Sequence, residues 1–167
     1  MDTSTKTLII LRHAKSDWST GAPDFDRPLT DLGRLDAHAA GNLISSYPID
    51  LVWCSAAKRT QETWEQAHLG GAQAKEIDVR RSFYDTWVDA LISEMTLLDD
   101  TVSTLAIVNH QPTVGDLVFI LARPSTLTSQ VSEHFPTAGV AVLSYQGSWA
   151  SIRGQDLVLD RFDRVRA

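Results

Sequence analysis

Apolar runs alternate along the chain with segments whose apolar positions recur at helical spacing. The runs Thr7–Leu11, Ile49–Ser55 and Thr104–Asn109 are almost continuously apolar, which is typical of strands buried on both faces of a parallel sheet. Residues 74–79 are predicted to form a further, shorter strand. Strands that alternate with helices indicate an α/β fold. We therefore expect a three-layer α/β/α sandwich with a mostly parallel central sheet, in a single domain over residues 1–167.

The first helix is predicted between the first two apolar runs. Thr30 and Asp31 can cap a helix that runs to about residue 46, because Pro48 ends it. Its apolar face is predicted to consist of Leu32, Leu35, Ala39, Leu43 and Ile44.

The rest of the chain continues the same alternation. Three more helices are expected, over residues 56–67, 86–98 and 112–121, and Ser55 is well placed to cap the first of them. Residues 122–136 are predicted to be a polar loop. The segments 139–145 and 149–153, separated by Gln146–Gly147, are predicted to form a terminal β-hairpin.

Composition narrows the class of protein. The 167 residues carry a formal charge of −6, which argues against a nucleic-acid partner, because affinity for phosphate backbones comes from clustered Lys and Arg. The single cysteine, Cys54, excludes a disulfide framework and a Cys-rich metal site, and it is predicted to be a small buried hydrophobe. No run approaches the ~20 apolar residues that span a bilayer, and the amino terminus is polar. We therefore expect a cytoplasmic protein with no membrane partner.

Cationic and polar side chains follow the three buried strands. Arg12 and His13 come after the first strand, Ser55 and Arg59 after the second, and His110 after the third. Ligands bind beyond the carboxyl ends of parallel strands, so these groups are expected to meet. Guanidinium and imidazolium groups bind phosphate oxygens, and a neutral histidine is also a nucleophile. The pattern predicts a phosphate pocket able to transfer a phosphoryl group.

Five ordered blocks extend this interpretation across nearly the whole chain. They are LRHAKSDW (11–18), DRPLTDLG (26–33), CSAAKRTQET (54–63), VNHQPT (108–113) and FPTAGVAVL (135–143). Together they resemble the histidine phosphatase superfamily, and in particular its short SixA-type phosphohistidine phosphatases. The resemblance implies a phosphoglycerate mutase-like fold and an activity that needs no metal or organic cofactor.

The resemblance also implies roles for individual residues. His13 matches the nucleophile that takes the phosphoryl group and is then freed by water. Arg12 and Arg59 match the arginines that clamp the phosphate, and His110 matches the second histidine, which stabilises charge on the transferring group. Arg27 matches a position that lies near the phosphate in short members of the family.

Further site residues are expected from adjacency, and two positions depart from the family pattern. Ser16 and Asp17 adjoin the nucleophile and are predicted to contact ligand. Many members carry a Glu shortly before a hydrophobic-Tyr pair, as general acid for the leaving group, but residues 79–82 hold no carboxylate before the pair at 83–84. Candidate replacements are Asp17, Asp26 and Asp85. Asn109 replaces a common Gly, and its side chain either crowds the pocket or points away.

Absence of the usual acid favours substrates whose leaving group departs easily. Neutral imidazole has a conjugate-acid pKa near ~6.5 and leaves far more readily than an alkoxide. We therefore expect a metal-independent phosphohistidine phosphatase acting on a histidine-phosphorylated protein or a small phosphoramidate. The alternatives are a phosphatase of a small phosphomonoester and a non-catalytic phosphate- or phosphoprotein-binding relative. Trp18 and Trp87 are candidates for the pocket mouth, and Trp53 and Trp149 for the core.

Overall fold

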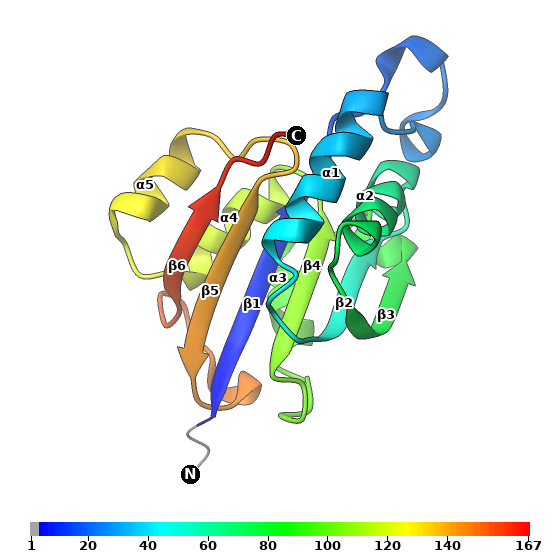
Figure 1. Ribbon diagram of the computed structural model, residues 1–167. Helices are drawn as coiled ribbons and strands as arrows, with labels where there is room; N and C mark the ends of the chain where they lie inside the picture. The colour runs from blue at the N-terminus through cyan, green and yellow to red at the C-terminus, as the bar shows by residue number, and fades with distance from the viewer. Residues whose placement is uncertain (1–3) are drawn as a thin grey trace.

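The structure, a computed structural model that describes residues 4–167, is built on one six-stranded sheet with the strand order β3-β2-β4-β1-β5-β6 (Figure 1). Strands β3, β2, β4 and β1 are parallel, whereas β5 is antiparallel to both β1 and β6. The bounds are β1 Thr5–Arg12, β2 Ile49–Ser55, β3 Ala74–Arg80, β4 Thr104–Asn109, β5 Val140–Gln146 and β6 Val158–Asp163. The sheet is thus mostly parallel, as predicted.

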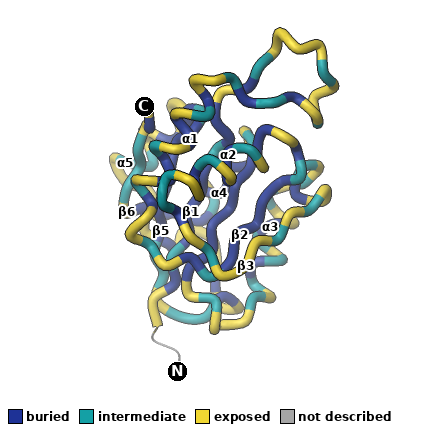
Figure 2. The backbone as a smooth tube through the Cα atoms, turned by 45° about the vertical axis from the view of Figure 1, so that its right-hand side comes forward, coloured by how far each residue is buried: buried dark blue, intermediate teal, exposed yellow. Residues whose placement is uncertain are grey.

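Helices cover both faces of this sheet. Alternate residues of β1 belong to two separate hydrophobic clusters, Leu8 and Ile10 to one and Ile9 and Leu11 to the other. The first cluster is completed by helices α3 (Val88–Met95), α4 (Thr113–Leu121) and α5 (Thr126–Glu133), the second by α1 (Asp31–Leu43) and α2 (Lys58–Leu69). The strands form the buried centre between these layers (Figure 2). This confirms the predicted three-layer sandwich.

Helix α1 buries only part of the predicted face: Ile44 belongs to the core and Ala39 and Leu43 pack against it, but the first two turns differ. Leu32 and Leu35 are 49% and 58% exposed, so placing them in the core was wrong. The buried positions of α1 are Gly33, Asp36, Ala37, Ala40 and Gly41. A Cβ on Gly41 would lie 1.9 Å from the backbone oxygen of Ala67 in α2, so only glycine allows the two helices to approach this closely. Close backbone packing, rather than large apolar side chains, selects this face.

Two predictions about the last third of the chain are wrong. The expected loop 122–136 contains α5, which begins with a capping box between Ser125 and Thr128. Val131 is its buried residue, so the helix lacks the apolar stripe that would have revealed it. The expected second hairpin strand, 149–153, holds a short 3₁₀ turn with Trp149 in the core, and β5 pairs instead with β6. Within residues 4–167, no helix is long and apolar enough to cross a bilayer.

Candidate active site

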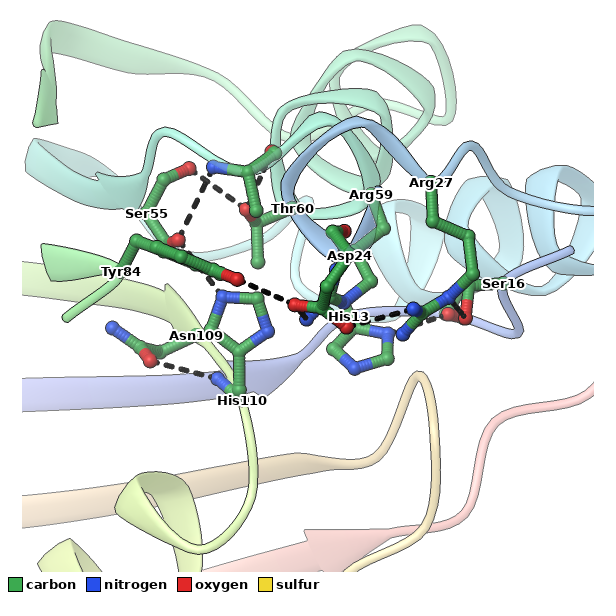
Figure 3. A network of polar contacts seen from close by, with 12 residues as sticks. His13, Ser16, Asp24, Arg27, Ser55, Arg59, Thr60, Tyr84, Asn109 and His110 are labelled. Carbon is green, nitrogen blue, oxygen red and sulfur yellow. Dashed lines mark hydrogen bonds and ion pairs between the residues drawn. The ribbon is translucent and has the colours of Figure 1, made fainter. Parts of the chain in front are cut away.

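The carboxyl ends of three neighbouring parallel strands carry the candidate chemistry. Arg12 ends β1 and His13 follows it, Ser55 ends β2, and His110 follows the last residue of β4. Because the strand order places β4 between β1 and β2, the two histidines face each other with ring centroids 5.3 Å apart (Figure 3). The topology therefore brings together residues that are almost one hundred positions apart in sequence.

His13 is held in one tautomer. Its Nδ1 lies 2.7 Å from the backbone oxygen of Ala14, and since a carbonyl only accepts, Nδ1 carries the proton. The Nε2 atom is then left with its lone pair. Burial, and after it the positive charge of Arg59 and Arg12, lowers the pKa of His13 to about 4. The imidazole is consequently neutral at pH 7, which is the state a nucleophile needs.

His110 is also neutral, and Ser55 contacts it. Ser55 Oγ and His110 Nε2 are 2.8 Å apart. Burial, and then the proximity of His13 and Arg59, lowers the pKa of His110 to about 3. Ser55 Oγ also accepts from the backbone N–H of Ala57 at 3.3 Å, as expected of a residue that precedes a helix, although α2 begins two residues later than predicted, at Lys58. Its contact with the histidine was not predicted from the sequence.

Buried nitrogens without a hydrogen-bond partner gather at the same place. Within the described chain, the buried side-chain nitrogens that lack a hydrogen-bond partner are Arg12 Nε, Arg59 Nε and His110 Nδ1. Arg12 is anchored by its Nη1, which donates to the backbone oxygen of Phe135 at 2.8 Å. Burial, and then nearby Arg59, lowers the pKa of Arg12. Buried donors without partners are unfavourable, so the pocket is suited to an anion with several acceptor oxygens.

Asp24 is the site residue that sequence reasoning missed. It lies in the segment between β1 and α1, and its carboxylate reaches Arg27 Nη1 at 2.7 Å and Arg59 Nη2 at 3.1 Å (Figure 3). Arg59 Nη1 donates to the Asp24 backbone oxygen at 2.6 Å, and the Tyr84 hydroxyl donates to the carboxylate at 2.5 Å. The hydroxyl of Tyr84, followed by the two arginines, holds the pKa of Asp24 well below its usual range. Asp24 is therefore an ionised carboxylate bound to two arginines of the predicted site.

The segment that carries Asp24 is anchored at its two ends. Ala14 and Leu29 are fully buried with Ala37 and Ala138 in a small cluster. Arg27 Nε donates to Ser16 Oγ at 2.9 Å, so Ser16, a predicted ligand contact, holds a pocket arginine. The Arg27 guanidinium also lies 3.7 Å from the centroid of the exposed Trp18 ring. Asp24 is thus presented by a segment with fixed ends.

The three acids proposed as replacements for the missing Glu lie elsewhere. Asp17 caps a 3₁₀ turn by accepting from Ser19, so it is not among the residues brought together at the arginines. Asp26 is exposed and lines a hollow beside Lys58. Asp85 lies next to Tyr84 on the wall of a neighbouring groove. None of these three contacts the histidine pair or the arginines through a hydrogen bond or ion pair in the described chain.

Asn109 does not crowd the pocket. Its Nδ2 donates to the backbone oxygen of Phe83 at 2.9 Å, and its Oδ1 accepts from the His110 backbone N–H at 2.8 Å. The buried amide therefore ties the end of β4 to the segment that follows β3. Of the two outcomes left open by the sequence, the side chain pointing away is the correct one.

Comparisons with known proteins agree with this geometry. Residues 8–85 match the profile of the histidine phosphatase superfamily, branch 1. An uncharacterized protein of Mycobacterium tuberculosis is 38% identical over 149 residues, which cover 85% of this chain and 91% of the relative. A chain from Nakamurella multipartitia, assigned by name to the SixA phosphohistidine phosphatases, is 30% identical with a TM-score of 0.84 over 100% of both chains.

Two further solved structures share the fold. A chain from Agrobacterium tumefaciens, likewise assigned by name to SixA, is 26% identical and superposes with a TM-score of 0.78 over 95% of this chain and 97% of that one. The protein histidine phosphatase SixA complexed with tungstate is 20% identical, with a TM-score of 0.75 over 96% of both chains.

Proposed function

The chain belongs to the histidine phosphatase superfamily and is of the SixA type, and on that premise we propose that it hydrolyses phosphohistidine through a phosphoryl intermediate on His13. The substrate is a histidine-phosphorylated protein or a small phosphoramidate, and residues 1–167 act as one catalytic domain. The observation that carries the proposal is the neutral His13, whose free Nε2 lies in a pocket with Arg12, Arg59 and the second histidine, His110.

The reaction has two balanced steps. In the first, the His13 Nε2 lone pair forms a bond to phosphorus while the bond from phosphorus to the substrate imidazole breaks. The leaving nitrogen keeps the electron pair, and because the distal nitrogen of that ring carries a proton, a neutral imidazole departs. In the second, water attacks the phosphorus, the bond to His13 breaks, and inorganic phosphate is released. Arg12 and Arg59 hold the phosphoryl oxygens in both steps.

The contact with Ser55 determines which ring nitrogen of His110 can donate to the substrate in this scheme. If the Ser55 hydroxyl donates to His110 Nε2 across their 2.8 Å contact, the proton of the neutral ring is on Nδ1. This is the buried atom without a partner, and it then donates to a phosphoryl oxygen. Ser55 is the positioning residue that keeps this tautomer.

The charge state of Asp24 supports a leaving group that needs no acid. Asp24 is the carboxyl group at the arginines, and its lowered pKa keeps it ionised at neutral pH, so it has no proton to give. A substrate imidazole whose distal nitrogen carries a proton departs as the neutral ring, the conjugate base of an acid with a pKa near ~6.5, so it needs no acid at the breaking bond, whereas an alkoxide does. This favours the nitrogen–phosphorus bond of phosphohistidine over the ester of a sugar phosphate.

The test compares three substrates with EDTA present: a phosphohistidine peptide, p-nitrophenyl phosphate and a sugar phosphate. We expect the highest kcat/KM with phosphohistidine and an acid-labile phosphoenzyme that His13→Asn abolishes. Turnover of the phosphomonoesters but not of phosphohistidine would agree with membership of the superfamily and would refute phosphohistidine as the substrate. Loss of all turnover in the wild-type chain, with phosphate still bound, would favour a binding relative instead.

A further inference from the structure

A groove of about 340 Å³ lies next to the histidine pair, and Tyr84 and Pro112 are among the residues that line it. Tyr84 forms the wall nearest the site, because its ring lies 5.6 Å from the His110 ring and its hydroxyl donates to Asp24. Pro112, two residues after His110, also lines the groove. Anything attached to a phosphoryl group in the pocket and directed past His110 therefore enters this groove.

The groove is acidic. Among the described residues that line it are two carboxylates, Asp85 and Asp116, and no Lys, Arg or His. Both are exposed, and within residues 4–167 neither takes part in an ion pair. The neighbouring cation Arg81 lies over the rings of Phe25 and Tyr84, 4.3 and 5.9 Å from their centroids, and is not itself part of the lining. The negative charge of the groove therefore has no ion-pair partner among the described residues and is available to a bound ligand.

An aromatic side chain independently indicates the same occupant. Trp87 lines the groove and is 83% exposed, although an indole this large is usually covered. The indole face attracts a cation within about 6 Å of its centroid, and attracts an anion not at all. An exposed Trp in a groove that also contains two carboxylates is therefore matched to an ammonium or guanidinium group on an aliphatic stem, which packs its stem on the ring and presents its charge to the acids.

We propose that this groove binds a Lys or Arg side chain close in sequence to the phosphorylated histidine of a polypeptide substrate. The inference rests on the proposed function and deepens it, because it selects basic over acidic phosphohistidine segments. Charge complementarity is the reason for committing to a cation, since an acidic segment would bring like charges against Asp85 and Asp116.

The experiment measures binding separately from turnover. Two peptides carry a non-hydrolysable phosphohistidine analogue, phosphoryltriazolylalanine, and differ only in lysine or glutamate at the flanking positions. Calorimetry at low ionic strength is expected to give on the order of tenfold tighter binding of the lysine peptide, and added salt should shrink the difference. The double variant Asp85→Asn/Asp116→Asn should abolish the preference. Asp160→Asn, which removes an exposed charge from β6 at the far edge of the sheet, should retain it.

Each outcome decides the inference. Equal binding of the two peptides, or tighter binding of the glutamate peptide, overturns it, and so does a lysine preference that survives in the double variant. Trp87→Ala should reduce the preference for the lysine peptide without reversing it. An unchanged preference would show that the indole does not contribute to binding of the cation. Turnover of the corresponding hydrolysable peptides is measured in parallel, so a chain that prefers lysine but hydrolyses neither peptide would refute the proposed function and leave the groove assignment standing.

Discussion

Replacing Asp24 by Asn tests how the pocket treats an incoming anion. The Asp24 carboxylate bonds to Arg27 at 2.7 Å and Arg59 at 3.1 Å, and its backbone oxygen takes the remaining Nη of Arg59. A phosphoryl group that binds Arg59 must either displace this carboxylate or lie beside its negative charge. Both routes weaken anion binding. Asp24→Asn preserves the shape and removes the charge, so we expect the variant to bind oxyanions more tightly than the wild type.

The magnitude follows from the bonds that are lost. A hydrogen bond to a charged group contributes about 1.5–3 kcal/mol. The arginine side chains are almost fully buried but the Asp24 side chain is 51% exposed, so solvent screening puts the estimate at the lower end. About 1.5 kcal/mol corresponds to roughly tenfold in a dissociation constant. Tungstate or vanadate should therefore bind about tenfold more tightly to Asp24→Asn.

The same variant should be less stable without an anion, because two buried guanidinium groups lose their counterion. The pKa of Asp24 is lowered in the folded state, so its contribution to stability is fully present above the unfolded-state pKa near ~3.9, declines below that pH, and is lost as the pH falls through the lower pKa of the folded state. The difference in unfolding free energy between wild type and variant should thus be full at pH 7 and small in strong acid.

The assay is calorimetric titration with tungstate at pH 7, together with urea unfolding from strong acid to pH 7. Asp26→Asn is the matched control, because Asp26 is an exposed acid two residues away that lines a hollow beside Lys58 instead of the arginines. It should change neither tungstate affinity nor stability by more than a few tenths of a kcal/mol. Weaker tungstate binding by Asp24→Asn would refute the reasoning and make Asp24 a residue that positions the arginines for phosphate.

Further predictions follow from the site and the fold. His13→Asn should abolish turnover and the acid-labile phosphoenzyme together, and retained turnover would exclude His13 as the nucleophile. In a pH–rate profile, kcat/KM should decline on the acidic side near pH 4 instead of pH 6.5, because the lowered pKa of His13 keeps the neutral ring present down to that pH. A decline near pH 6.5 would contradict the burial of His13. Ser55→Ala should lower kcat by roughly tenfold through loss of the hydrogen bond to His110, with KM changed less; an unchanged kcat would remove Ser55 from the mechanism. Gly41→Ala should lower the free energy of unfolding by about 1–3 kcal/mol and the melting temperature by several degrees, because the new Cβ meets the Ala67 backbone, and an unchanged melting temperature would show that α1 can shift.

The sheet and the cationic pocket could be predicted because both depend on strongly periodic signals. Continuous apolar runs identify strands that are buried on both faces. Because parallel strands end at the same edge of the sheet, Arg12 and His13 are then predicted to lie beside His110. The prediction for α1 held at Ile44 but failed at Leu35, because the size of an apolar side chain does not decide burial there: Gly41 is buried against a backbone, while Leu35 faces solvent. No hydrophobicity pattern encodes a contact that depends on the absence of a side chain.

Asp24 could not have been selected from the sequence by the same reasoning. It lies in a segment without periodicity, and Asp26 is equally acidic and nearer to Arg27 in sequence. The distinction between them is a matter of side-chain direction, which is set by the anchoring of the segment at Ala14 and Leu29. A spacing of three residues between Asp24 and Arg27, which favours contact across one helical turn, is the signal that was present.

The charge of the pocket matches the group that it is proposed to transfer. Both histidines are neutral at pH 7, so the charged side chains are the three guanidinium groups of Arg12, Arg27 and Arg59 and the single carboxylate of Asp24, which leave a net charge of +2. A phosphoryl dianion neutralises that charge without protonation of the nucleophile. A protonated His13 would add attraction for phosphate but remove the lone pair that attacks it. Burial first, and then the arginines that are proposed to hold the phosphate, lower the pKa of His13, which explains why a positively charged site is compatible with a histidine nucleophile.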